Sequence, residues 1–297
     1  MTTRHSPSTG PGSPDVWGLY EPDTGSVQYI CACPRTRKAA LIDVVLNFDP
    51  ACARTSTKSA EAVLELAAGQ GLEVAWVLDT HPHADHMMAS AWLRGKTGAP
   101  NAIGSKVEEI AELWRELYNM PGAFDVRRDF DRLLAEGDRL SIGDLEAEVW
   151  LSPGHTLGSI SYVVGDAAFV HDTLMYPDSG SSRADFPGAC VHQLWDSLQR
   201  ILSLPAETRL FVGHDYCKGG RDPAWEATVA EHRASNVHLK DGTSKDEFVR
   251  VRTERDSGLP LPARMLAALQ VNLRGGRLPQ PESDGASYLK IPLNKFG

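Results

Sequence analysis

The chain has 297 residues, of which 42% are hydrophobic and 23% are charged, as is usual for a globular protein with a buried core. The formal net charge of −9 argues against a nucleic-acid or anionic-membrane surface, because both require clustered Lys and Arg. No stretch approaches the roughly 18 apolar residues of a membrane span. Met1–Asp15 is rich in Ser, Thr, Pro and Gly and lacks the apolar core of a signal peptide. We therefore predict a disordered tail over residues 1–15 and a cytoplasmic protein, without a disulfide framework because its five cysteines are odd in number.

The first region, residues 16–104, alternates β-type and helical patterns. Ser26–Ala32 and Lys38–Val44 predict two strands, and the apolar spacing of Thr57–Gly69 predicts a helix. Leu72–Leu78 predicts a further strand that leads into a histidine-rich loop. A helix is predicted directly after this loop, over Met87–Arg94.

The remaining chain continues this alternation and then becomes helical. The second region, residues 106–189, predicts a helix over Lys106–Tyr118 and strands over Glu146–Leu151, Ser159–Val164 and Ala167–His171. The third region predicts a helix over Cys190–Leu202, a strand over Thr208–Val212, and helices over Ala224–Ser235, Ser244–Asp256 and Pro262–Gln270. Such an order favours packed layers of sheet and helix that end in a helical cap.

The strongest chemical signal is the segment His81-x-His83-x-Asp85-His86, which places four potential metal ligands within six residues. Imidazole and carboxylate groups suit Zn²⁺, Fe²⁺ and Mn²⁺. A polar turn with incidental histidines is the competing interpretation. Three of the ten histidines of the chain fall in this one loop, which makes coincidence a poor explanation.

Three more candidate ligands follow predicted strands. His155 stands in Pro-Gly-His-Thr, Asp172 follows His171, and His214 precedes Asp215. Taken alone, His155 would more often be structural and Asp172 would more often cap a turn. Their shared position at strand ends favours a common site, because loops held by a rigid scaffold usually supply ligands.

Together these motifs resemble the metallo-β-lactamase superfamily over roughly residues 18–216. The resemblance implies an α+β fold, the αββα sandwich, with a catalytic domain over residues 16–220 and a C-terminal helical extension over residues 221–297 packed on the same domain. It also implies two metal sites, one of His81, His83 and His155 and one of Asp85, His86 and His214, which Asp172 bridges.

Four segments resemble the persulfide dioxygenases, which are similar in fold to glyoxalase II. These segments are Thr80–His86, Gly180–Phe186, His214–Tyr216 and Leu269–Arg274. The resemblance implies oxidation of glutathione persulfide by O₂ to sulfite and glutathione, at one Fe²⁺ per chain held by His81, His155 and Asp172. Two His and one carboxylate leave open positions on iron for both substrates. His83, Asp85, His86 and His214 would then orient the ligands through hydrogen bonds.

The same resemblance indicates substrate contacts. Arg183 offers a planar fork to a glutathione carboxylate, with a surface salt bridge to Asp185 as the alternative. Tyr216 would donate a hydrogen bond to the thiol-bearing part, or else be a half-buried core tyrosine, and Thr156 would contact the peptide. Asp85 and Tyr216 are the candidate catalytic residues.

One residue departs from the superfamily pattern. His171 stands where a glycine usually precedes the bridging aspartate. In an extended strand its side chain should point opposite to that of Asp172, away from the metal.

Other functions stay open. The main alternative is a hydrolase of the glyoxalase II type that binds one or two Zn²⁺ ions and, as a dinuclear enzyme, cleaves a thioester. A β-lactamase is disfavoured because no export signal is present, and a non-catalytic binding module is disfavoured because no ligand position is lost. The C-terminal helices either complete the pocket for a small thiol substrate or form a homodimer face.

Overall fold

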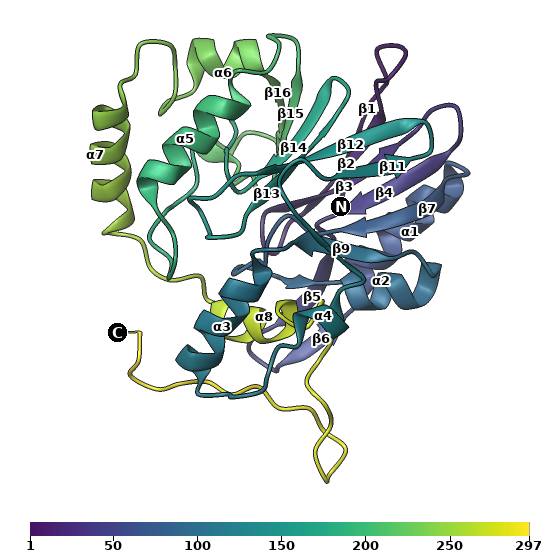
Figure 1. Ribbon diagram of the computed structural model, residues 1–297, viewed down its shortest axis with the longest axis vertical. Coiled ribbons are helices and arrows are strands. Elements are labelled where there is room, and N and C mark those ends of the chain that lie inside the picture. The colour runs from purple at the N-terminus through teal and green to yellow at the C-terminus, as the bar shows by residue number, and fades with distance from the viewer. Residues whose placement is uncertain (297) are drawn as a thin grey trace.

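Two β-sheets pack face to face in the computed structural model, which describes residues 1–296. The larger sheet has the order β1-β2-β3-β4-β7-β9-β10 and the second sheet the order β11-β12-β13-β14-β15-β16 (Figure 1). A small sheet, β6-β5-β8, lies beside them.

The strands of the larger sheet are β1 (Thr2–Ser6), β2 (Asp15–Glu21), β3 (Ser26–Ala32), β4 (Lys38–Ile42), β7 (Glu73–Leu78), β9 (Asn101–Gly104) and β10 (Arg132–Leu134). Those of the second sheet are β11 (Arg139–Ile142), β12 (Leu145–Leu151), β13 (Ile160–Val164), β14 (Ala167–His171), β15 (Arg209–Val212) and β16 (Glu226–Thr228). The small sheet contains β5 (Val45–Asp49), β6 (Arg54–Ser56) and β8 (Met87–Met88). The helices are α1 (Lys58–Gly69), α2 (Ser90–Thr97), α3 (Val107–Tyr118), α4 (Val126–Asp129), α5 (Val191–Ile201), α6 (Val229–Ser235), α7 (Lys245–Asp256) and α8 (Met265–Asn272), with a 3₁₀ turn at Lys218–Gly220.

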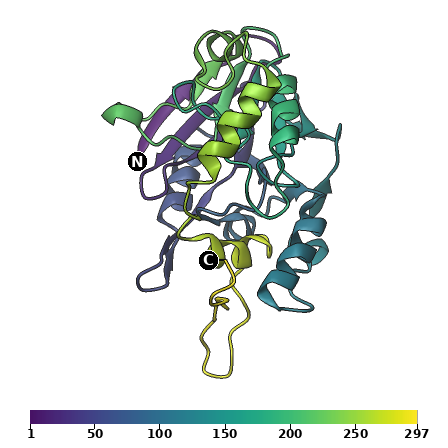
Figure 2. The same cartoon turned by 90° about the vertical axis from the view of Figure 1, so that its left-hand side faces the viewer.

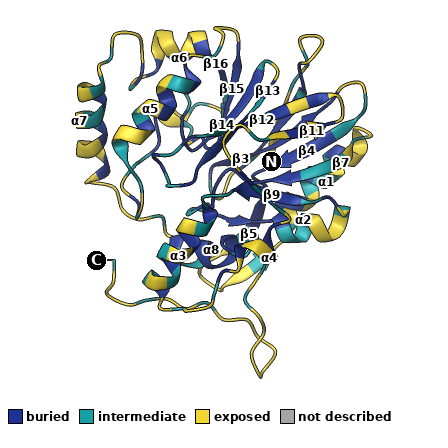
Figure 3. Ribbon diagram, in the orientation of Figure 1, coloured by how far each residue is buried: buried dark blue, intermediate teal, exposed yellow. Residues whose placement is uncertain are grey.

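Alternation along β3 shows how the layers form. Val27 and Tyr29 point into the core between the two sheets, whereas Ile30 and Ala32 point to the opposite face, which α1 and α2 cover. The central strands of both large sheets are mostly buried, whereas β1, β6 and the outer faces of the helices are exposed (Figure 3). Helix α5 covers the outer face of the second sheet, so the αββα sandwich expected from the sequence is confirmed.

Three predicted helices begin three or more residues later than expected, among them the helix predicted from Pro262, which is α8 and begins at Met265. Residues 226–228 pair with β15 as strand β16, so the helix predicted from Ala224 begins only at Val229. Likewise Met87 and Met88 pair with β5, and α2 begins at Ser90. In the last two places a few residues before the helix form backbone hydrogen bonds with a strand elsewhere in the chain. Helical periodicity in the sequence cannot reveal such pairing.

The N-terminal residues differ from the predicted disordered tail. Residues 2–6 form β1, which pairs antiparallel with β2 in the register Thr2 to Tyr20. The buried guanidinium of Arg209 fixes the segment that follows, donating to Ser6 Oγ at 2.8 Å and to Ser13 Oγ at 3.0 Å. Backbone pairing needs no apolar side chains, so a polar composition did not prevent a strand here.

The C-terminal helices lie on different parts of the sandwich. Helix α7 packs against α5, and α8 packs beside β8, while the chain after α8 extends away from the sheets (Figure 2). No helix within residues 1–296 is long and apolar enough to span a bilayer. The domain boundaries given above stay predictions.

Replacing Arg209 should release the N-terminal segment. We expect Arg209→Met to lower the free energy of unfolding by roughly 3 kcal/mol, because it leaves several buried acceptors without a donor. Hydrogen exchange read by mass spectrometry should show faster exchange in residues 2–14 than in the rest of the chain. Arg139→Met, which removes an exposed pair with Glu146, is the control and should change stability by about 0.5 kcal/mol or less. Unchanged exchange in residues 2–14 would contradict the role of Arg209.

Candidate metal centre

All seven predicted ligands lie in one buried cluster at an edge of the sandwich. The loop after β7 supplies His81, His83, Asp85 and His86, while His155, Asp172 and His214 follow β12, β14 and β15. Donor atoms within 4.8 Å of one another occur in four groups: His81, His155 and Asp172; His83, Asp85 and His86; His171, Asp172 and His214; and His81, His83 and His171. The cluster is therefore suited to metal binding, and the assignment of each ligand stays a prediction.

Several imidazoles have one nitrogen fixed and the other free, as metal ligands do. His81 Nδ1 lies 3.1 Å from Thr80 Oγ1, and His83 Nε2 lies 2.9 Å from Asp43 Oδ1. Their opposite nitrogens, His81 Nε2 and His83 Nδ1, are buried without a hydrogen-bond partner among residues 1–296, as is His86 Nε2. Orphaned buried nitrogens are costly unless a ligand engages them, so the donor set fits a metal cation.

Asp172 faces two of these histidines with one oxygen. Its Oδ2 lies 3.6 Å from His81 Nε2 and 3.8 Å from His155 Nε2. His155 is oriented in turn by its Nδ1, which donates to the carbonyl oxygen of Arg183 at 2.8 Å. Two imidazoles and one carboxylate thus converge as donors that can hold a metal ion.

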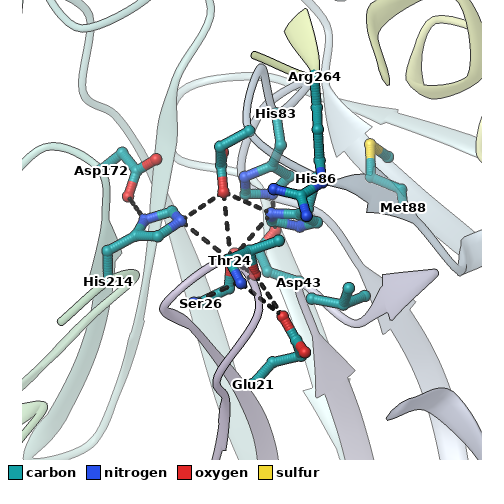
Figure 4. A network of polar contacts seen from close by, with 12 residues as sticks. Glu21, Thr24, Ser26, Asp43, His83, His86, Met88, Asp172, His214 and Arg264 are labelled. Carbon is teal, nitrogen blue, oxygen red and sulfur yellow. Dashed lines mark hydrogen bonds and ion pairs between the residues drawn. The ribbon is translucent and has the colours of Figure 1, made fainter. Parts of the chain in front are cut away.

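His214 is held on both sides by carboxylates. Its Nδ1 lies 2.6 Å from Asp172 Oδ1 and its Nε2 lies 2.6 Å from Asp85 Oδ2, with Ser26 Oγ at 3.0 Å (Figure 4). Desolvation lowers the pKa of His214, but Asp172 and Asp85 outweigh it and raise this pKa well above its usual value.

The pKa is lowered, not raised, for three other imidazoles. Desolvation is the largest cause that lowers the pKa of His81, His83 and His155, and for the first two the pKa falls well below its usual value. These side chains are therefore neutral near pH 7, which is the state that can ligate a metal.

His171 does not point away from Asp172 as expected. Its backbone φ is +36° at a register shift in β14, which breaks the strand alternation. The buried imidazole turns toward the cluster, with Nδ1 3.4 Å from Asp172 Oδ1. The expectation was wrong because it assumed extended geometry up to the last residue of the strand.

Two residues of the site were not recognised in the sequence. Asp43 accepts from the backbone nitrogen of Thr80 at 2.8 Å and from His83. Its position directly after β4 was a usable signal, but the predicted strand ran through it to Val44. Asn272 on α8 donates to the carbonyl oxygens of His83 and His86 at 2.7 and 2.8 Å, and accepts from the nitrogen of Met88.

A pocket of about 540 Å³ opens onto the cluster at Asp85, His155, Asp172 and His214. Tyr216 lines it, is 64% exposed, and stacks on His214 with ring centroids 5.9 Å apart, so it is not a core tyrosine. Its catalytic and substrate-binding roles stay predictions. Thr156 lines a smaller neighbouring pocket, and its hydroxyl is 2.7 Å from Ser159 Oγ, so a peptide contact there stays a prediction too.

Arg183 lines the pocket but has partners within the protein. It forms a two-point pair with Asp185, with distances of 2.6 and 2.7 Å, and donates to the carbonyl oxygen of Pro260 at 2.6 Å. This geometry matches the alternative considered from the sequence. A grip on a substrate carboxylate stays a prediction that would require Asp185 to be displaced.

Comparison with known proteins identifies the family of this chain. Residues 26–214 match the metallo-beta-lactamase superfamily. The chain is 53% identical over 281 residues to a "Beta-lactamase hydrolase-like protein" of Agrobacterium fabrum, covering 95% of this chain and 65% of that protein. It is 29% identical over 277 residues to "Persulfide dioxygenase ETHE1, mitochondrial" of Bos taurus, covering 92% and 93%.

One solved structure extends this likeness. The crystal structure of ETHE1 from Myxococcus xanthus matches with a TM-score of 0.69 and 32% identity, covering 88% of this chain and 98% of that one. The chain thus spans 65% of the length of the Agrobacterium relative but nearly all of the ETHE1 structure.

Asn272 should be needed for metal binding. We expect Asn272→Ala to weaken metal affinity by about 10-fold to 100-fold, because the loop that carries His83 and His86 loses its support from α8. Gln270→Ala is the matched control. That side chain is equally buried and donates to Leu266 and Lys290 carbonyl oxygens, away from the loop. Both variants should lose stability, but only Asn272→Ala should lose Co²⁺ affinity in a chelator competition. Equal metal affinities in the two variants would contradict this role.

Proposed function

Because the chain belongs to the metallo-β-lactamase superfamily, we propose that it is a glutathione persulfide dioxygenase with one non-haem Fe²⁺. It would oxidise the sulfane sulfur of glutathione persulfide with O₂ to sulfite. The observation that carries this proposal is the contrast between two sets of side chains. His81, His155 and Asp172 converge and His81 Nε2 has no hydrogen-bond partner among residues 1–296, whereas His214 is bonded to carboxylates on both nitrogens.

The residues that would hold the iron are His81, His155 and Asp172. Fe²⁺ in such a set supplies open positions at which a persulfide sulfur and O₂ meet. The protein contributes orientation, because Thr80 and the Arg183 carbonyl fix the two imidazoles. Asp85 and His214 hold each other beside the pocket and keep a charged hydrogen-bond network at its base.

The pocket wall suits an anionic thiol. Four cationic side chains line it, but Arg183 is paired with Asp185 and Arg252 with Asp256. The other two are Lys218 and Arg255. Neither forms an ion pair with a carboxylate among residues 1–296. We therefore expect the carboxylates of the glutathione part to lie toward Lys218 and Arg255.

Replacement of Arg255 should separate binding from turnover. We expect Arg255→Met to raise KM for glutathione persulfide by about tenfold with little change in kcat, because a charge-assisted hydrogen bond of roughly 1.5–3 kcal/mol is lost. Arg250→Met is the control on the same helix, since Arg250 is exposed and pairs with Glu254. A KM that rises for Arg183→Met but not for Arg255→Met would instead support the contact predicted from the sequence.

A dinuclear zinc hydrolase of the glyoxalase II type is the second candidate, and one observation favours it. His86 Nε2 is buried, has no hydrogen-bond partner among the described residues, and belongs to a donor group with His83 and Asp85. A second cation could be held there, and two zinc ions would supply an activated water for thioester cleavage. The cytoplasmic location and a homodimer remain predictions from the sequence.

Oxygen uptake with metal counting distinguishes the two candidates. Protein reconstituted anaerobically with iron is given glutathione persulfide, and total metal per chain is measured on the same sample. We expect rapid uptake and sulfite at about one iron per chain, with both lost in His81→Ala. No uptake, together with two zinc ions per chain and thioester cleavage, would replace the dioxygenase with the hydrolase. Zinc content alone decides nothing, because zinc binds such ligands more tightly than iron.

A further inference from the structure

His171 keeps a backbone conformation that a histidine adopts only at a cost. Its φ of +36° lies in the left-handed region, which glycine enters freely and other residues rarely do. The residue is also 1% exposed, at the end of β14 where the pairing register shifts. Strain of this kind persists where the surroundings over-determine it, and it is often found at functional sites.

The neighbouring strand leaves space for this imidazole. Gly213 follows β15, and a Cβ atom added there would lie 2.2 Å from His171 Nδ1 and 2.6 Å from Asp172 Oδ1. Any side chain at residue 213 would therefore displace both groups. The site thus requires a glycine at residue 213 because of the space there and not because of its φ. It keeps a histidine at residue 171 although the φ there favours glycine.

The two nitrogens of His171 lie close to two different carboxylates. Nε2 lies 3.1 Å from Asp43 Oδ2 and Nδ1 lies 3.4 Å from Asp172 Oδ1, at angles that make neither contact a hydrogen bond among residues 1–296, so the interaction is one of proximity and charge. Asp43 is itself fixed by Thr80 and His83. His171 therefore spans the distance between a carboxylate that orients His83 and a carboxylate that faces His81 and His155.

Asp172 consequently has one oxygen occupied and one available. Oδ1 is approached by His171 and by His214, while Oδ2 is the atom that faces His81 Nε2 and His155 Nε2. Rotation of this carboxylate would exchange the two oxygens and alter how it meets a cation. We propose that His171 is a positioning residue that, wedged between Asp172 and Asp43, keeps Asp172 from rotating and so fixes which of its oxygens is presented to the metal.

The role of His171 rests on the metal centre of the proposed function, but not on the reaction performed there. Co²⁺ is therefore used as the probe, since its visible spectrum reports the ligands without turnover. The test variant is His171→Gly, because glycine accepts a φ of +36° and the fold should be kept. His171→Asn is measured beside it, because asparagine also tolerates left-handed backbone. Ala53→Gly, at an exposed residue with a φ of +51°, is the control for backbone relief.

We expect metal-free His171→Gly to melt at or above the temperature of the wild type, as should Ala53→Gly. Its Co²⁺ affinity should fall by about 10-fold to 100-fold with an altered visible spectrum, whereas Ala53→Gly should keep both. X-ray absorption should count the same number of imidazoles on Co²⁺ as in the wild type.

Two results would overturn the proposal. Affinity within twofold of the wild type and an unchanged spectrum, in both His171 variants, would mean that the residue only fills space. One imidazole fewer on Co²⁺ would make His171 a ligand itself, as its group with His81 and His83 allows. Failure of the wild type to oxidise glutathione persulfide would instead reject the proposed reaction, and would leave these Co²⁺ measurements unaffected.

Discussion

Face-to-face packing of the two sheets is the constraint on which the site depends. Apolar side chains of β3 and β4 meet those of β12 to β15, and this contact brings the ends of several strands to one edge. Polar residues just beyond those ends cannot enter the apolar core. They gather at the edge instead and satisfy one another, with Asp172 bonded to His214 and Asp43 to His83. The chemistry is therefore a product of sheet geometry, because no single segment contains the whole donor set.

Electrostatics divides the histidines of this edge into two kinds. Desolvation lowers the pKa of His81 and His155 and so keeps them neutral, whereas Asp85 and Asp172 raise the pKa of His214 and hold a proton on it. The mononuclear proposal uses this division as it stands. A dinuclear site would require His214 and Asp85 to exchange their mutual hydrogen bond for bonds to a second cation. The hydrogen bond between His214 and Asp85 is therefore one contact whose loss the dinuclear candidate would have to offset.

The last third of the chain takes part in the same site. Asn272 reaches back 189 residues to the carbonyl oxygen of His83, and α7 brings Arg255 to the pocket wall. Earlier in the chain, the carbonyl oxygen of Arg183 accepts from His155 and so orients that imidazole. The helices after β15 are thus part of the structure that shapes the metal loop and the pocket. This dependence gives a physical reason why a segment that contains Asn272 takes part in the resemblance to persulfide dioxygenases.

The sequence by itself predicted layers of sheet and helix, most of the helices and seven of the residues that form the donor groups, and its motifs implied the αββα sandwich through their resemblance to a family. Periodicity and ligand chemistry are encoded within a few neighbouring residues, so the loop from His81 to His86 could be recognised without a structure. Tertiary structure decided the rest: the pairing of β1, the direction of His171, the partner of Arg183 and the importance of Asp43. Each of these depends on a strand, a backbone angle or a partner group set by packing between elements. Such long-range geometry leaves no periodic trace in the amino-acid order.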